Sequence, residues 1–211
     1  MQNNKDRFLV TGSAGFIGAA LCKKLLSEGY NVAGIDNLNN YYDIKIKYDR
    51  LKVIENFIKD KKNLWEFFKV SIENIVEIKD IFIKNKPDIV INLAAQAGVR
   101  FSIDNPASYV KSNLNGFFNI LENCKDNNVE HLVYASSSSV YGGNDDYPFN
   151  ENQKINRPLS FYAATKISNE MMAYSYSNIH NIPITGLRFF TVYGPWGRPD
   201  MAPMIFSKKY F

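Results

Sequence analysis

One stretch near the start of the chain limits the possible folds more than any other feature: residues 7–18, with the sequence RFLVTGSAGFIG. Its apolar run FLV has the pattern of a short buried strand, and an apolar face with helical periodicity begins where the stretch ends. Between them, Gly12, Gly15 and Gly18 stand at three-residue spacing. In a strand–turn–helix crossover such glycines allow a tight turn, close approach of a pyrophosphate, and close packing of helix on strand. The stretch therefore predicts a phosphate site at a helix N-terminus, the alternative being a glycine-rich turn without a ligand.

An acidic residue ends the next predicted strand, NVAGI at residues 31–35. Asp36 follows Gly12 at close to the spacing of about 20 residues at which a carboxylate holds the ribose hydroxyls of a bound dinucleotide. A carboxylate at that place would repel a 2′-phosphate, so NAD is favoured over NADP. The alternative is an aspartate that only caps a turn.

The rest of the chain continues the alternation of apolar runs and amphipathic segments. Further strands are expected at 64–70, 88–93, 131–135 and 184–190, and helices at 16–28, 43–56, 75–82, 103–127 and 160–180, the last with Ser160 as its N-cap. This order indicates an α/β fold, a doubly wound parallel sheet with right-handed crossovers. Ligands bind such sheets at the carboxyl ends of the strands. Residues 37–63 are polar and basic and are assigned no chemistry.

Composition excludes several classes of function. The net charge of +4 is small and evenly spread over 211 residues, so no nucleic-acid partner is expected. No apolar stretch is long enough to span a bilayer, and the polar start MQNNKDR is unlike a signal peptide, so we expect a cytoplasmic protein. Cys22 and Cys124 fall in expected helices as small buried hydrophobic residues; neither a disulfide nor a metal site is expected.

A candidate catalytic pair lies on the last predicted helix. Tyr162 and Lys166 are one turn apart, so their side chains share a face. An ammonium group near a phenol lowers the pKa of the phenol, which could then remove a hydroxyl proton at neutral pH. Ser137, in the cluster SSSSVYG after the strand at 131–135, could bind the same substrate oxygen. A Tyr and a Lys at this spacing are common, but the glycine motif and Asp36 upstream favour the chemical interpretation.

Together these motifs resemble the extended short-chain dehydrogenase/reductase family, and within it the NAD-dependent nucleotide-sugar epimerases. The resemblance covers residues 7–202 and is carried by TGSAGFIG, Asp36, LAAQAGV at 93–99, SSSSVYG, and YAATK at 162–166. It implies a Rossmann domain that binds NAD over residues 1–190. It also implies that residues 191–211 begin a second, smaller substrate-binding domain, most of which is missing.

The resemblance also implies the residues of the site. The catalytic set is Ser137, Tyr162 and Lys166. Residues implied to contact NAD are Gly12, Gly15, Phe16, Ile17, Gly18, Asp36, Asn37, Ile72, Leu93, Ala94, Ala95, Asn113, Tyr162, Lys166 and Phe190. Residues implied to contact the substrate, a UDP-sugar, are Arg100, Ser138, Ser139, Thr191 and Arg198. One departure is Ser71, which stands where the family usually has an aspartate against the adenine.

A narrower resemblance, to UDP-glucuronate 4-epimerases, rests on AGVRFSIDNP at 97–106 and RFFTVYGPWGRPDMA at 188–202. A glucuronate carries a carboxylate, for which an arginine fork is a natural partner; Arg198 is the first choice and Arg100 the second, unless either is merely structural or solvated. Sister dehydratases and decarboxylases place acidic residues after the catalytic serine or threonine. Ser138 and Ser139 are poor acids and bases, which favours an enzyme that only oxidises and re-reduces C4.

Two other functions stay open at this point. One is an epimerase for UDP-glucose or its N-acetylated relatives, and the other is a truncated NAD-binding module without turnover. In this family helices such as those at 103–127 and 160–180 often pair across a two-fold axis, so a homodimer is expected.

Overall fold

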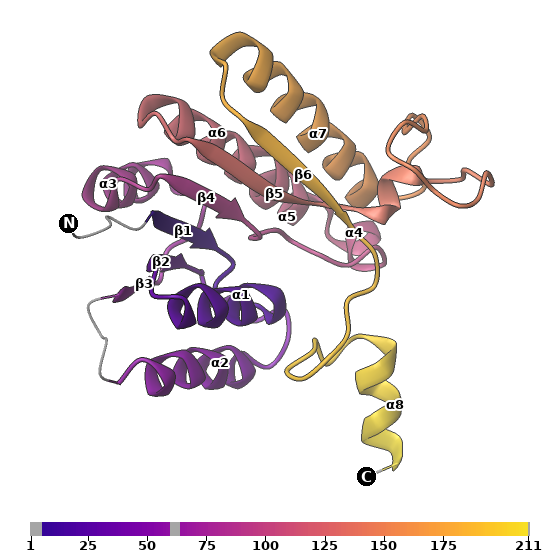
Figure 1. Cartoon of the computed structure of the whole chain (residues 1–211). Coiled ribbons are helices and arrows are strands. Elements are labelled where there is room, and N and C mark those ends of the chain that lie inside the picture. Colours follow the sequence, from indigo (N-terminus) through magenta and orange to yellow (C-terminus); the bar gives the residue numbers. More distant parts are fainter. Residues whose placement is uncertain (1–5, 60–63, 211) are drawn as a thin grey trace.

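A computed structural model describes residues 6–59 and 64–210 (Figure 1). Its centre is one parallel sheet of six strands in the order β3-β2-β1-β4-β5-β6. The strands are β1 (Arg7–Thr11), β2 (Asn31–Ile35), β3 (Trp65–Phe68), β4 (Ile89–Asn92), β5 (His131–Ser137) and β6 (Ile184–Phe189). All six lie within two residues of the predicted boundaries. The predicted doubly wound parallel sheet is therefore confirmed.

Helices cover both faces of the sheet. The longer helices are α1 (Phe16–Ser27), α2 (Ile44–Phe57), α3 (Ile75–Asn85), α6 (Phe117–Asp126) and α7 (Phe161–His180). Side chains of α1 and α2 pack in one apolar cluster with β1 and β2. Those of α3, α6 and α7 pack in another cluster on the opposite face. Figure 1 shows the sheet between these two helical layers.

The central strand β1 shows why the sheet is covered on both sides. Leu9 belongs to the cluster under α3 and α6, whereas the next residue, Val10, belongs to the cluster under α1. Both side chains are fully buried, because successive residues of a strand point to opposite faces. Cys22 and Cys124 are buried too, one in each cluster, as small hydrophobic residues.

Side-chain caps explain where several helices begin. Ser160 accepts a hydrogen bond from the backbone N–H of Ala163 (3.0 Å) at the start of α7, which confirms the predicted N-cap. Asp43 caps α2 in the same way by accepting from Lys45 N–H (2.9 Å). Each side chain satisfies one backbone donor that has no partner within the helix.

The helix predicted over 103–127 is not regular. It is divided into α4 (Phe101–Asp104), α5 (Pro106–Tyr109), a π-helical turn η2 (Val110–Gly116) and then α6. Asn105, between α4 and α5, has an extended φ of −135°, as expected for a residue that precedes proline. The π turn widens the helix by one residue, and such turns are frequent at functional sites.

The C-terminal part of the chain leaves the two layers. Residues 190–201 form no regular strand or helix, and a final helix α8 (Ala202–Tyr210), which is not among the predicted helices, follows them. Figure 1 shows α8 apart from the helices that cover the sheet. Ile205 and Phe206 are exposed on it. Among the described residues, no helix is long and apolar enough to cross a membrane.

Candidate active site

The glycine motif forms a closely packed turn between β1 and α1. Gly12 adopts a left-handed φ of +71°, and its carbonyl accepts a hydrogen bond from Gly15 N–H (2.9 Å). A Cβ at Gly18 would lie 2.1 Å from that same carbonyl oxygen, so only glycine fits there. The three glycines therefore keep the backbone of the turn close to the N-terminus of α1, as a phosphate-binding helix end requires.

Asp36 lies at the end of β2 with its carboxylate directed at the glycine turn. Its oxygens accept hydrogen bonds from the backbone N–H groups of Ala14 (3.2 Å) and Leu38 (2.8 Å). The ammonium group of Lys47, on α2, lies 3.6 Å from the carboxylate and donates to Asn39 (2.9 Å). Burial lowers the pKa of Lys47, while the charge of Asp36 acts in the opposite direction. Asp36 is thus fixed in orientation by backbone donors and accompanied by a buried cation.

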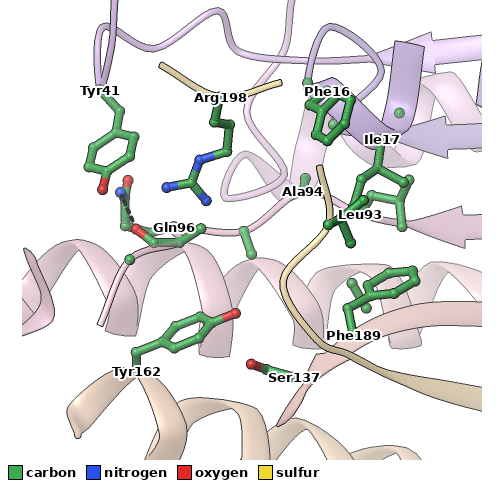
Figure 2. Close-up of a pocket in the computed structure, with 18 of the residues that line it drawn as sticks. Phe16, Ile17, Tyr41, Leu93, Ala94, Gln96, Ser137, Tyr162, Phe189 and Arg198 are labelled. Atoms are coloured by element: carbon green, nitrogen blue, oxygen red, sulfur yellow. Dashed lines mark hydrogen bonds between the residues drawn. The ribbon is translucent and has the colours of Figure 1, made fainter. Parts of the chain in front are cut away.

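One cavity of about 710 Å³ lies at the carboxyl ends of the strands and gathers the predicted residues (Figure 2). The predicted site residues that line it are Gly12, Gly15, Phe16, Ile17, Gly18, Asp36, Asn37, Ile72, Leu93, Ala94, Ala95, Arg100, Ser137, Ser138, Ser139, Tyr162, Lys166, Phe190, Thr191 and Arg198. Ser71 is not in that lining, and its hydroxyl accepts from Glu73 N–H (3.4 Å). Of the predicted site residues, all of which the structure describes, only Asn113 is absent from the lining.

Asn113 lies behind the cavity wall instead of in it. Its side chain is buried, accepts from Gln96 N–H (2.8 Å), and donates to Gln96 C=O (3.1 Å) and to Thr165 Oγ1 (3.1 Å). Its own carbonyl accepts from the side chain of Asn169 on α7 (2.6 Å). The expected direct contact of Asn113 with a cofactor therefore has no geometric basis. Asn113 holds the segment after β4, which does line the cavity, against the helix that carries Tyr162.

Tyr162 and Ser137 face each other across the cavity floor, from α7 and the end of β5 (Figure 2). Lys166, one turn along α7, is buried and donates to the carbonyl of Ala135 (2.7 Å), while its nitrogen lies 5.9 Å from the centre of the Tyr162 ring. The Ser137 hydroxyl accepts from Ser139 N–H (3.2 Å). The three predicted catalytic side chains are thus brought together.

Burial dominates the electrostatics of the pair. Burial raises the pKa of Tyr162, and hydrogen bonding to Ser137 and the charge of Arg198 offset this only in part. Burial also lowers the pKa of Lys166 to about 8. The expected effect of Lys166 on the phenol stays a prediction: its ammonium group is directed at the Ala135 carbonyl, and Arg198 is a further cation that lowers the pKa of Tyr162.

The two candidate arginines have different surroundings. Arg198 enters the cavity from the segment after β6 and forms a two-point ion pair with Asp200: Nε to Oδ1 at 3.1 Å and Nη2 to Oδ2 at 2.5 Å (Figure 2). Its guanidinium also lies over the ring of Tyr41, 5.5 Å from the ring centre. Arg100 lines the cavity at the start of α4 with an exposed side chain, and it has no carboxylate partner within the described part of the chain. Arg198 is the better placed of the two.

Sequence reasoning missed a group of site residues that come from the segment after β2. Tyr41, Tyr42 and Lys47 line the cavity, although Asn37 is the single residue of the segment 37–63 among the predicted site residues. Their position just after the carboxyl end of a strand was the signal that could have found them. Behind them, Arg50 is buried and donates to Tyr42 Oη (2.6 Å), to the Ala14 carbonyl (3.1 Å) and to the Trp196 carbonyl (2.7 Å). Arg50 thereby joins the glycine turn to the segment that carries Arg198.

With this geometry in view, the chain matches the "NAD dependent epimerase/dehydratase family" over residues 8–208. It belongs to that family. Among curated relatives, it is 54% identical over 204 residues to "Protein CapI" of Staphylococcus aureus, covering 96% of this chain and 59% of the relative. It is 46% identical over 216 residues to "UDP-glucuronate 4-epimerase 4" of Arabidopsis thaliana, covering 98% of this chain and 46% of the relative. The chain of this family member thus spans about half to three fifths of the length of those relatives.

Solved structures of the family superpose on the chain closely. The UDP-glucuronic acid 4-epimerase of Bacillus cereus, in complex with UDP-glucuronic acid and NAD, has a TM-score of 0.84 at 35% identity, over 94% of this chain and 60% of that chain. A UDP-glucose 4-epimerase of Thermotoga maritima with UDP-glucose has a TM-score of 0.83 at 31% identity, over 96% and 62%. The fold of this family is therefore the fold of the chain.

The cofactor of the family is NAD, and the residues present fit it. Gly12, Gly15 and Gly18 each leave no room for a Cβ, which keeps this turn compact enough for a pyrophosphate to approach the helix end. Asp36, fixed by Ala14 and Leu38, presents a carboxylate where ribose hydroxyls would bind. Ile72 and the small residues 94–95 complete the apolar walls of this half of the cavity.

Proposed function

We propose that this chain carries the cofactor and catalytic half of an NAD-dependent nucleotide-sugar 4-epimerase, with UDP-glucuronate as the substrate and UDP-galacturonate as the product. The observation that carries the proposal is the meeting of Ser137, Tyr162 and Lys166 with the glycine turn and Arg198 around one cavity. Similarity to UDP-glucuronate 4-epimerases in sequence and structure supports it.

Tyr162 is the proposed base. Its hydroxyl would take the proton of the sugar 4-hydroxyl, and Ser137, which faces it, would hold the same oxygen in place. Bound NAD supplies the acceptor and donor of the hydride at C4. The resulting 4-keto sugar turns over within the site, and Tyr162 returns its proton when C4 is reduced from the other face. The net reaction inverts only the configuration at C4, so it needs no further acid or base. This agrees with serines, and not acidic residues, at positions 138 and 139.

The charge balance around Tyr162 suits this role. Burial holds the pKa of the phenol above its ordinary value, while the hydrogen bond to Ser137 and the positive charge of Arg198 act in the opposite direction and favour the phenolate. Lys166 anchors α7 to β5 through the Ala135 carbonyl and keeps Tyr162 opposite Ser137. Removing the charge of Lys166 should therefore disturb the position of Tyr162 as well as the local potential.

The test is a measurement of product formation by the purified chain loaded with NAD. UDP-glucuronate and UDP-glucose are supplied separately, and UDP-galacturonate and UDP-galactose are quantified by anion-exchange chromatography. We expect epimerisation of UDP-glucuronate, and its loss in Tyr162→Phe, which keeps the ring but removes the hydroxyl. Preference for UDP-glucose would reassign the substrate, since a UDP-glucose 4-epimerase is also a structural neighbour. Retention of NAD without conversion of either sugar would leave only a cofactor-binding module.

The partner we propose is a second copy of the chain. Large apolar side chains are exposed on η2, α6 and α7, namely Val110, Phe118, Met171, Tyr174 and Ile179. Large apolar side chains that are exposed together mark an interaction surface, so the exposure of Val110 and Phe118 calls for a covering surface. Phe118→Glu should convert a dimer into a monomer in sedimentation experiments, whereas a wild-type monomer would contradict the proposal.

A further inference from the structure

Asp200 occupies only one edge of the Arg198 guanidinium. A guanidinium has five N–H donors in a rigid plane, and the carboxylate of Asp200 takes one from Nε and one from Nη2. Three donors on Nη1 and Nη2 are left. One N–H of Nη1 and the remaining N–H of Nη2 form the terminal edge of the group, and a second carboxylate can bind that edge at two points without displacing the first.

The surroundings keep the plane of Arg198 in one orientation. The guanidinium lies over the Tyr41 ring, and the Tyr41 hydroxyl donates to Asp200 Oδ2 (3.4 Å). The side chain of Arg198 is 23% exposed and that of Asp200 is 37% exposed, so the pair lies at the cavity wall and not in bulk solvent. Figure 2 shows the guanidinium between Tyr41 and Tyr162, directed into the cavity.

We propose that Asp200 is a positioning residue for substrate choice: it holds the Nε edge of Arg198 so that the terminal edge is presented to an anionic group on the sugar. The inference rests on the function proposed above and specifies how that site selects a carboxylated sugar. Asp200 also lines the cavity, but its proposed role is exerted through Arg198.

A competing interpretation makes the opposite prediction. If Asp200 simply neutralised Arg198, an anionic sugar would have to displace it, and removal of Asp200 would strengthen the binding of that sugar. If Asp200 positions Arg198, its removal leaves a long, flexible cation whose plane is no longer set, and the bidentate interaction is weakened. A neutral sugar makes no such interaction and should be affected little in either case.

The experiment compares Asp200→Ala and Asp200→Asn with the unmodified chain, all loaded with NAD, by isothermal titration calorimetry with UDP-glucuronate and UDP-glucose. We expect Asp200→Ala to weaken UDP-glucuronate binding about tenfold relative to UDP-glucose, with Asp200→Asn intermediate because the amide oxygen still accepts. Asp80→Ala, which removes an exposed carboxylate from α3, should leave the ratio unchanged. A ratio that is unchanged in Asp200→Ala, or shifted toward UDP-glucuronate, overturns the inference.

A second measurement needs no substrate. The Nε–H of Arg198 should give a ¹H–¹⁵N signal protected from solvent exchange, assigned by its loss in Arg198→Lys, and this protection should disappear in Asp200→Ala. If the unmodified chain binds neither nucleotide sugar, the proposed function fails for this chain. The spectrum then decides the positioning of Arg198, and an unprotected Nε–H in the unmodified chain overturns it.

Discussion

Asn113 offers a sharp test of how the cavity wall is held. Its side chain makes three hydrogen bonds, two with the backbone of Gln96 and one with Thr165. Asn113→Ala removes all three and leaves the N–H and the C=O of Gln96 without their partner. Thr165 keeps its bond to the Tyr162 carbonyl (2.8 Å), so the loss is concentrated on the segment after β4.

The size of the effect follows from these bonds. An unsatisfied backbone group in a protein interior costs about 1–3 kcal/mol, and water that enters the cavity can reach Gln96, which is only half-buried. We therefore expect the free energy of unfolding to fall by about 2–4 kcal/mol. For a chain of this size that corresponds to a decrease in melting temperature of about 5–15 °C. NAD affinity should fall about tenfold, because part of the binding energy must then reorder the segment.

Urea unfolding followed by circular dichroism gives the stability, and quenching of tryptophan fluorescence by NAD gives the affinity. The matched control is Asn127→Ala, which removes one bond from a half-buried asparagine to the Asn123 carbonyl at the end of α6 (2.9 Å) and should cost less than about 1 kcal/mol. If Asn113→Ala loses NAD affinity at unchanged stability, the side chain contacts the cofactor directly, and its role as a support behind the cavity wall is refuted.

Three further predictions concern the glycine turn, the buried lysine and the buried arginine. Gly18→Ala places a methyl group 2.1 Å from the Gly12 carbonyl, a contact that no side-chain movement relieves, so NAD affinity should fall at least tenfold in the same titration, and wild-type affinity would contradict the geometry. Burial lowers the pKa of Lys166 to about 8 from an ordinary 10.5, so above pH 8 the unfolded chain binds more protons than the folded chain. The free energy of unfolding of the wild type should therefore rise relative to that of Lys166→Met between about pH 8 and 10. A constant difference between the two across that range would contradict the lowered pKa. Arg50→Met removes the hydrogen-bond donors of two backbone carbonyls, those of Ala14 and Trp196. The free energy of unfolding should fall by about 2–3 kcal/mol, and amide hydrogen exchange in residues 194–200 should accelerate. Unchanged exchange in these residues would show that Arg50 does not hold the segment.

Local signals were enough to predict the sheet and most helices. Each strand is a short apolar run, and helix starts such as Ser160 have a side chain that can satisfy a free backbone N–H. The apolar pattern did not predict the π turn at Val110–Gly116, within which the Asn113 carbonyl accepts a tertiary hydrogen bond from the Asn169 side chain. Helical periodicity cannot show such an insertion, which shifts every later side chain around the axis.

For the site, the residue types that follow the strands predicted which residues line the cavity, but they did not predict in which direction each side chain points. Spacing and motif placed Asp36 and Tyr162 at the correct edge of the sheet, where both line the cavity. The spacing of Tyr162 and Lys166 correctly put them on one face of a helix. It could not show that the lysine nitrogen bonds to Ala135, since that depends on how α7 packs on β5. Tyr41 went unnoticed because it comes from a polar segment without periodicity.

The bonds of Arg50 have a thermodynamic consequence. One side chain donates both to the carbonyl of Ala14, within the phosphate-binding turn, and to that of Trp196, two residues before Arg198. Because one guanidinium holds both carbonyls, a movement of the glycine turn is expected to be passed on to the segment that carries Arg198, which would couple the two parts of the cavity wall. Such coupling is reciprocal: a ligand bound at the glycine turn and a ligand bound to Arg198 would strengthen each other's binding by equal factors.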